Sequence, residues 1–308
     1  GGAPQDIAFL ASASAALNAA APYVPEGAPV VAIEDEFPSV TLPFVNRGHP
    51  IRRVPIDGRG APDLDALARA LPGAGALTVG HVQFRTGRRL DLQALGALCR
   101  EAGALLIVDA TQSLGAGPVD AGPADVLVAS GDKWLCAGYG AAAVHLSPRL
   151  RERPSPVFGW RSAETPYALK SFEASPSPTA VRLEMGHPPF APVFALGGAL
   201  AHLADTLGGG DLRAALEAAR ARIAARSDRL REGLASEGGP APLAPPGESG
   251  IHVFPAADAP AAKAALAEAG ILATASTDYV RLSLHAFVAE EEVDRAALAL
   301  SRALRAAA

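Results

Sequence analysis

The chain has 308 residues, of which 49% are hydrophobic and 19% charged, and its formal net charge is −5. This length allows a large domain with a sizeable core and a smaller second domain, and the acidic balance without a long basic run argues against a general nucleic-acid binder. The two cysteines, Cys99 and Cys136, lie far apart and match no metal-site or disulfide spacing. Neither a secretory signal nor an uninterrupted apolar span of about 18 residues is present. We therefore expect a cytoplasmic, enzyme-sized protein without nucleic acid or a membrane among its partners.

Strand-like and helix-like segments alternate up to about residue 150. The predicted strands cover residues 6–11, 28–34, 51–57, 75–82, 104–110, 124–130 and 140–147. The predicted helices cover residues 12–24, 39–48, 63–73 and 90–103. Such alternation is typical of an α/β fold with a mostly parallel seven-stranded sheet between helices, in which ligand groups collect at the carboxyl ends of the strands.

The pattern changes in the second half of the chain. Residues 151–178 are rich in proline and have no clear period, which predicts an extended excursion over the surface or across the mouth of an active site. A long Ala/Leu/Arg-rich helix follows at 191–236, broken at GGGD, and a Gly/Pro-rich linker covers 237–250.

The last part of the chain reads as a strand-helix-strand-helix unit, from 250 to 304. We therefore expect a large domain over residues 1–195, and a linking helix with a smaller α+β domain over 196–308.

A carboxylate and an amine follow two of the buried strands. Asp109 ends the segment LLIVD, and Lys133 follows VLVASGD, 24 positions later. At neighbouring strand ends these groups can hold the two poles of a pyridine aldehyde cofactor, because the carboxylate keeps the ring nitrogen protonated and the amine forms the Schiff base. On spacing alone, an aspartate that caps the next helix and pairs with a nearby lysine explains the same residues equally well.

Two further stretches suit anionic groups. The segment ASASAALN places Ser12, Ala13 and Ser14 at the start of the first helix, where backbone amides and the helix dipole favour a phosphate, although serines there also serve simply as caps. In YVRLSLHAF, Arg281 lies on a predicted strand, and its planar guanidinium can hold an α-carboxylate with two parallel hydrogen bonds, unless it is a surface arginine.

Four stretches together resemble the class V aminotransferases, a fold-type I group of pyridoxal-phosphate enzymes that includes cysteine desulfurases, selenocysteine lyases, kynureninases and isopenicillin N epimerases. They are DATQSLGAGPVD, ADVLVASGDKWL, VFGW and YVRLSLHAFVAEEEVD, in this order. The resemblance implies pyridoxal 5'-phosphate as the cofactor and a homodimer with shared active sites.

The resemblance also implies roles for single residues. Lys133 is the Schiff-base lysine, Asp109 the partner of the pyridine nitrogen, Gln112 a donor to the phenolic oxygen of the cofactor, and Arg281 the ligand of the substrate carboxylate. His81 takes the position whose ring stacks on the cofactor, with a satisfied loop histidine as the alternative. Ser130 is a further phosphate contact.

Several features depart from the family pattern. Asp132 stands where many members have a histidine directly before the lysine, and a carboxylate there repels a phosphate and favours the ammonium form of the lysine. His187, in GHPP, stands where a threonine often reaches the phosphate of the neighbouring subunit, and we expect it to act as the donor there. The family usually has some tens of residues before the segment that resembles the start of this chain, so we expect that the start of the large domain is missing here or that the protein is a natural short form.

The interval AGILATASTDYVR before Arg281 contains no cysteine, whereas a desulfurase needs a nucleophilic thiolate there. Desulfuration through a persulfide is therefore disfavoured. We expect a pyridoxal-phosphate enzyme that acts at the α-carbon of an amino acid or amine, as an aminotransferase or a β-eliminating lyase. The alternative is an inactive class V scaffold that serves as a binding subunit.

Overall fold

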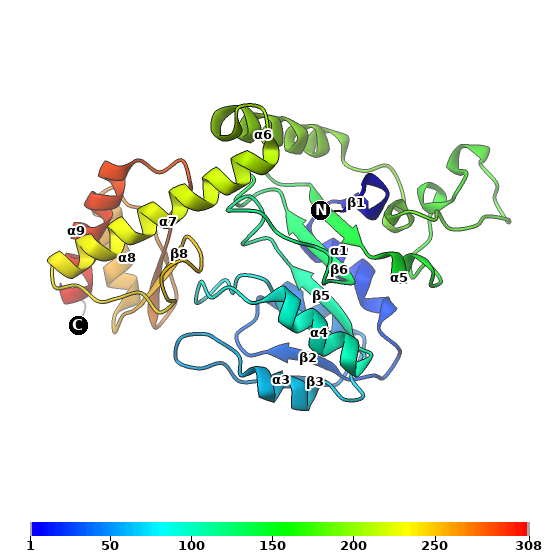
Figure 1. Ribbon diagram of the computed structural model, residues 1–308, viewed down its shortest axis with the longest axis horizontal. Helices are drawn as coiled ribbons and strands as arrows, with labels where there is room; N and C mark the ends of the chain where they lie inside the picture. Colours follow the sequence, from blue (N-terminus) through cyan, green and yellow to red (C-terminus); the bar gives the residue numbers. More distant parts are fainter. Residues whose placement is uncertain (1, 307–308) are drawn as a thin grey trace.

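The large domain is built on a seven-stranded sheet with the order β1-β7-β6-β5-β4-β2-β3 (Figure 1). The computed structural model describes residues 2–306. The strands are β1 (Ile7–Leu10), β2 (Val30–Ile33), β3 (Ile51–Val54), β4 (Ala76–Gly80), β5 (Leu105–Asp109), β6 (Val126–Ser130) and β7 (Ala142–Leu146). Strand β7 runs antiparallel to both of its neighbours, β1 and β6, and the other neighbouring strands of this sheet pair in parallel. The expected α/β architecture with a mostly parallel sheet is confirmed.

Helices cover both faces of this sheet, because successive side chains of a strand point to opposite faces. On β5, Leu105 and Ile107 belong to the core that includes α1 (Ala13–Ala20) and α2 (Pro38–Asn46). Leu106 and Val108 belong to the core on the other face, with α3 (Leu64–Ala70) and α4 (Leu92–Ala102). The continuous apolar run of β5 is thus explained by burial on both sides.

The polar signals in the sequence set the ends of the helices. Asp91 accepts hydrogen bonds from the amides of Gln93 and Ala94 at the start of α4, and Gly103 ends that helix with a φ of 71°. A left-handed residue of this kind is cheapest as glycine.

The proline-rich excursion lies at the end of the large domain far from the small domain (Figure 1). It follows α5 (Pro148–Arg151) and contains short 3-10 turns, and a further turn directly after it, Ala180–Leu183, packs against β1. Two long helices come next, α6 (Phe190–Gly208) and α7 (Leu212–Ser236), separated by left-handed Gly209 and Gly210. The expected boundary between residues 195 and 196 falls inside α6.

Helix α6 is by length and composition alone apolar enough to cross a membrane. One such helix is weak evidence for a membrane protein. Within the chain, α6 packs along α7, and its buried residues are Leu196, Leu203 and Ala204.

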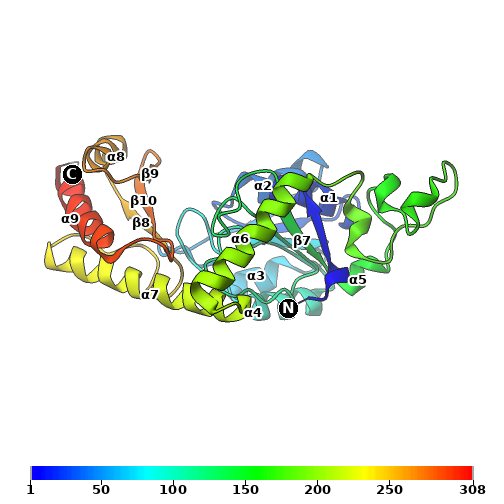
Figure 2. The ribbon, with the colours of Figure 1, turned by 90° about the horizontal axis from the view of Figure 1, so that it is seen from above.

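The small domain packs its own sheet against the far end of α7 (Figure 2). Its strands β8 (Ile251–Pro255), β9 (Thr274–Ala275) and β10 (Tyr279–Ser283) are antiparallel in the order β8-β10-β9. Helices α8 (Ala259–Glu268) and α9 (Glu290–Ala306) complete its core. Helix α7 therefore runs from beside the large sheet to the small domain, and β10 brings Arg281 to the junction.

Candidate active site

A cavity of about 560 Å³ lies between the two domains, at the carboxyl ends of the parallel strands. Residues that follow β1, β2, β4, β5 and β6 form most of its wall, and the small domain adds residues of β9 and β10. This is the edge of a parallel sheet at which ligands bind, and the volume suits a small ligand. The predicted site residues that line the cavity are Ser12, Ala13, Ser14, Asp109, Gln112, Ser130, Lys133 and Arg281.

One end of the cavity is the start of helix α1. The hydroxyl of Ser12 caps this helix by accepting a hydrogen bond from the amide of Ala15 at 3.1 Å. The amides of Ala13 and Ser14 precede the first bond of the helix, so they remain available to an anion. The hydroxyl of Ser14 lies 2.7 Å from that of Ser39, which also lines the cavity. Amides and hydroxyls are thus gathered where the helix dipole favours negative charge.

Asp109 lies at the end of β5 and is buried. Burial raises the pKa of its carboxyl group, and the hydrogen bonds from Thr111, including one from the amide at 2.9 Å, compensate only in part. A cation placed against this carboxylate in the cavity would stabilise its charged form. Gln112 is fixed by the indole of Trp134, which donates to its Oε1 at 3.0 Å and leaves the amide nitrogen of Gln112 free to donate.

Lys133 follows β6 by three residues, and its ammonium nitrogen lies 2.5 Å from Oδ2 of Asp132. The hydroxyl of Ser130 donates a hydrogen bond to the other oxygen of the same carboxylate. Burial alone would raise the pKa of Asp132, but the hydrogen bonds from Lys133 and Ser130 outweigh it and hold the pKa below its usual value. The side chain of Asp132 is therefore turned toward the lysine. It also accepts a hydrogen bond from the hydroxyl of Ser130, which was predicted to contact a phosphate.

Arg281 reaches the cavity from β10 of the small domain. Its Nη1 donates to the carbonyl oxygen of Phe84 at 2.8 Å, and its Nη2 donates to the hydroxyl of Thr274 at 3.3 Å. The guanidinium is thus held between the two domains, with further N–H groups left for a carboxylate.

The structure corrects the placement of His81. This residue is absent from the cavity wall, whereas its neighbours Gly80 and Val82 belong to it, because successive side chains along an extended segment alternate between faces. Its Nδ1 lies 2.9 Å from the hydroxyl of Ser113, and burial lowers the pKa of the imidazole to about 4. His81 is therefore a buried, neutral histidine that faces Ser113, and its stacking on a cofactor stays a prediction that this placement does not support. The rings of Phe37 and Phe84, whose centroids lie 5.4 Å apart, both line the cavity.

Glu36 and Phe37 line the cavity and were missed by the sequence reasoning. Oε1 of Glu36 accepts a hydrogen bond from the amide of Gly80 at 2.9 Å. Burial, with a smaller contribution from the charge of Asp109, raises the pKa of Glu36 to about 8. The signal was present in the sequence, since EDEFPS follows a predicted strand just as Asp109 does.

His187 lies outside the cavity of its own chain. Its ring packs against Trp160 and Phe190, with centroid distances of 4.9 and 5.7 Å. Its expected contact with the phosphate of a neighbouring subunit stays a prediction.

Neither cysteine lines the cavity. Cys99 is buried in the core on helix α4, and Cys136 is exposed, with its sulfur 3.6 Å from Nε2 of His285. Among the described residues, no group of three or more His, Cys, Asp or Glu side chains is arranged to hold a metal ion.

The donor set of the cavity fits pyridoxal 5'-phosphate. The start of α1 suits the phosphate, the buried carboxylate of Asp109 suits a protonated ring nitrogen, and Lys133 supplies an amine for the aldehyde. Asp109 is the strongest part of this fit, because a buried carboxylate with a raised pKa gains most from a cationic partner.

The chain is similar in sequence to two kinds of characterised enzymes. It is 32% identical to a kynureninase of Deinococcus radiodurans over 166 residues, which is 53% of this chain and 39% of that enzyme. It is 30% identical to a cysteine desulfurase of Trichormus azollae over 152 residues, which is 47% of this chain and 38% of that enzyme. The matches thus span well under half the length of these relatives.

Solved structures agree in fold. The cysteine desulfurase CsdA of Escherichia coli superposes with a TM-score of 0.81 at 21% identity, over 99% of this chain and 80% of that one. The cystine C–S lyase C-DES, in complex with its product cysteine persulfide, superposes with a TM-score of 0.81 at 21% identity, over 97% and 82%. The family model for class V aminotransferases matches residues 1–296. The chain therefore belongs to the class V aminotransferase family of pyridoxal-phosphate enzymes.

Proposed function

We propose that this protein is an enzyme that uses pyridoxal 5'-phosphate to transform an amino acid or amine at its α-carbon, by transamination or by lyase chemistry. The observation that carries the proposal is the convergence of Lys133, Asp109 and Arg281 on one cavity that also contains the start of helix α1. These groups come from two domains and from segments far apart in the chain, so their meeting is difficult to explain by helix capping or chance pairing alone.

Each residue has a distinct role in this proposal. Lys133 would hold the cofactor, whose ring, when bound, would supply an electron-withdrawing group for the substrate. Asp109 holds the proton on the ring nitrogen, and Arg281 orients the substrate by its carboxylate. The amine of Lys133, once released, is the base placed to take the α-proton.

Desulfuration through a persulfide carried by this chain is disfavoured. That chemistry needs a thiolate beside the substrate, and neither Cys99 nor Cys136 lines the cavity. Burial also raises the pKa of both thiols, to about 12 for Cys99. Transamination and β-elimination need no such cysteine.

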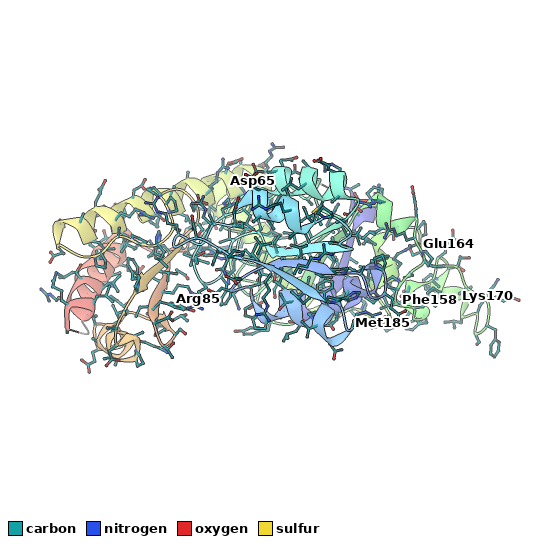
Figure 3. The ribbon with its side chains drawn as sticks, turned by 90° about the horizontal axis from the view of Figure 1, so that it is seen from below. Asp65, Arg85, Phe158, Glu164, Lys170 and Met185 are labelled. Carbon is teal, nitrogen blue, oxygen red and sulfur yellow. The ribbon has the colours of Figure 1, made fainter. Side chains whose placement is uncertain are left out.

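We further propose that two copies of the chain assemble as a dimer. Several large apolar side chains of the excursion and of α6 are exposed, among them Phe158, Met185 and Phe194. Figure 3 shows Phe158 and Met185 at the end of the large domain that lies far from the small domain. An exposed apolar surface of this kind is typical of a subunit interface.

The purified protein, mixed with pyridoxal 5'-phosphate, is expected to develop a visible absorbance band that Lys133→Ala abolishes. Asp109→Asn is the companion variant, because it keeps the shape of the side chain and removes the charge. A panel of amino acids, with separate assays for keto acid, ammonia and sulfide, then identifies the reaction. If added cofactor gives no band, or if the band persists without Lys133, the inactive-scaffold alternative replaces this proposal.

A further inference from the structure

The wall of the cavity nearest the small domain is a tight turn between β4 and α4, here called hairpin 82–89. It is closed by hydrogen bonds between the amide of Gln83 and the carbonyl of Arg88, and between the amide of Gly87 and the carbonyl of Gln83, both 2.8 Å. The buried side chain of Gln83 also accepts from the amides of Arg85 and Thr86, at 2.6 and 2.9 Å. The tip of the hairpin thus has few free backbone groups and presents a fixed shape.

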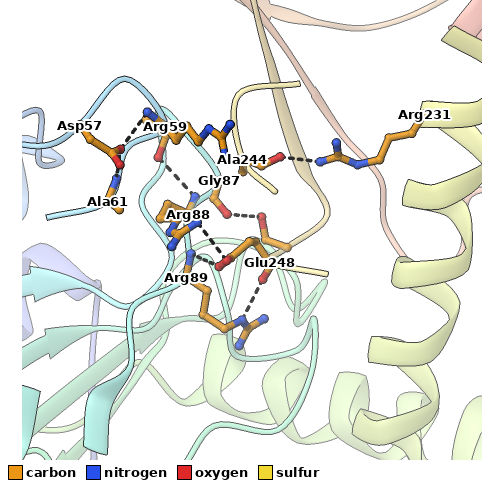
Figure 4. Close-up of polar contacts among 11 residues, drawn as sticks. Asp57, Arg59, Ala61, Gly87, Arg88, Arg89, Arg231, Ala244 and Glu248 are labelled. Carbon is orange, nitrogen blue, oxygen red and sulfur yellow. Dashed lines mark hydrogen bonds and ion pairs between the residues drawn. The ribbon is translucent and has the colours of Figure 1, made fainter. Parts of the chain in front are cut away.

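The linker before β8 holds one side of this hairpin (Figure 4). Glu248 lies between Arg88, at 3.2 Å, and Arg89, whose amide donates to it at 3.0 Å. Ser249 donates to the carbonyl of Gly87 at 2.7 Å. The base of the hairpin is therefore anchored to the linker, but these contacts do not touch β10.

Arg85 makes the contact with β10. Its Nη2 lies 2.7 Å from Oδ2 of Asp278, directly before that strand, and its guanidinium carbon lies 5.2 Å from the ring centroid of Tyr279. Its Nη1 lies 3.3 Å from Oδ1 of Asp35, in the large domain. Figure 3 shows Arg85 at the junction between the large sheet and the strands of the small domain.

The position of Arg281 depends on the same junction. Its contact with the large domain is the bond from Nη1 to the carbonyl of Phe84, the residue before Arg85. Its Nε is buried without a hydrogen-bond partner among the described residues. A small movement of β10 away from the hairpin would therefore break the bond to Phe84 and leave the guanidinium held by Thr274 of its own domain.

We propose that Arg85 is a positioning residue for Arg281: by pairing with Asp278 and covering Tyr279, it holds the start of β10 against hairpin 82–89 and so fixes the guanidinium that faces the cavity. This inference rests on the proposed function in one respect, the role of Arg281 as the ligand of a carboxylate. The placement of β10 by Arg85 does not depend on it.

The test uses the chain loaded with pyridoxal 5'-phosphate and sodium propionate as a carboxylate probe that lacks an amino group. Binding is followed by the absorbance of the bound cofactor. Arg85→Met and Asp278→Asn are each expected to weaken propionate binding about two- to fivefold, the size of one partly exposed ion pair. The double variant is expected to bind propionate with no lower affinity than the single variant that binds it more weakly, because both substitutions remove the same contact.

Two control variants separate this contact from general loosening. Asp35→Asn removes the other partner of Arg85, and Arg88→Met removes an ion pair between the hairpin and the linker. Both are expected to leave propionate binding within twofold of the wild type, because neither partner lies on β10. Arg281→Lys gives the full loss of the carboxylate ligand for comparison.

Hydrogen exchange in the cofactor-free chain gives a readout that does not depend on catalysis. The amides of Val280–Ser283 are expected to exchange faster in Arg85→Met and Asp278→Asn, and unchanged in Asp35→Asn. Unchanged exchange in Arg85→Met overturns the proposal. The proposal also fails if Arg85→Met exchanges faster but binds propionate as the wild type does, while Arg281→Lys binds propionate more weakly. If Arg281→Lys leaves propionate binding unaltered, the carboxylate role in the proposed function fails, and exchange alone decides whether Arg85 places β10.

Discussion

The carboxylate of Asp132 lies 2.5 Å from the ammonium nitrogen of Lys133, and it also accepts the hydroxyl of Ser130. The amine that must react with the cofactor aldehyde is thus in close contact with a carboxylate. This contact distinguishes the site from family members with a histidine before the lysine, and it makes loading with cofactor sensitive to residue 132.

Asp132→Asn is expected to load pyridoxal 5'-phosphate about two- to fivefold faster, because the amine of Lys133 is released from an ion pair of modest strength with Asp132. The rate is measured as the growth of the visible band after mixing. Asp125→Asn is a suitable control, since Asp125 precedes the same strand at its other end. Slower loading in Asp132→Asn would instead show that the carboxylate accepts a proton during loading.

Glu36 makes stability depend on pH. The pKa of Glu36 is about 8 in the folded chain, whereas a glutamate in the unfolded chain has a pKa of about 4.5, so the folded state binds an extra proton between these pH values. The free energy of unfolding is therefore expected to fall as pH rises from 4.5 toward about 8, by about 1.4 kcal/mol per pH unit at most.

Glu36→Gln is expected to remove this slope, so that the variant gains stability relative to the wild type as pH rises. Urea unfolding at several pH values measures the effect. Glu34→Gln, an exposed carboxylate two positions earlier, is the control. Parallel pH profiles for the wild type and Glu36→Gln would contradict the burial of this carboxyl group.

Phe37→Ala is expected to weaken the binding of pyridoxal 5'-phosphate up to about tenfold, because the variant removes an aromatic ring from the cavity wall. His81→Asn is expected to leave cofactor affinity within twofold, because that side chain faces Ser113 outside the cavity. Fluorescence titration with the cofactor measures both constants. The opposite order of effects would restore His81 as the ring that contacts the cofactor.

Gly87→Ala is expected to destabilise the chain by about 2 to 4 kcal/mol. Its φ is +78°, and an added Cβ would lie 2.3 Å from the carbonyl oxygen of Ile251. Gly73→Ala is the matched control, since its φ is +70° and nothing lies within 4 Å of an added Cβ there, so only the backbone strain of about 1 kcal/mol remains. The difference between the two variants in the midpoint of urea unfolding measures the clash. Equal midpoints would mean that the backbone at Ile251 moves aside without loss of stability.

Much of the fold followed from local patterns. Strands β4 and β5 and the end of α4 at Gly103 lie within the predicted ranges, because their signals act within a few residues, whereas the cap at Asp91 was not predicted. The site followed in part, because strand-end residues such as Asp109 and Lys133 meet at one edge once the strands are parallel. Errors arose where the outcome depended on which way a side chain faces, as for His81.

The sequence by itself determined the alternation of strands and helices, through its periodicity, and the positions of Asp109 and Lys133 after two buried strands, whereas the family followed from a resemblance of whole motifs. Tertiary structure alone decided that the side chain of Asp132 turns toward Lys133 and that Arg85 pairs with Asp278 across the junction. It also decided that Glu36 and Phe37 line the cavity, whereas His81 does not. These contacts join segments up to 193 positions apart, and their formation depends on how sheets and domains pack, which no local pattern encodes.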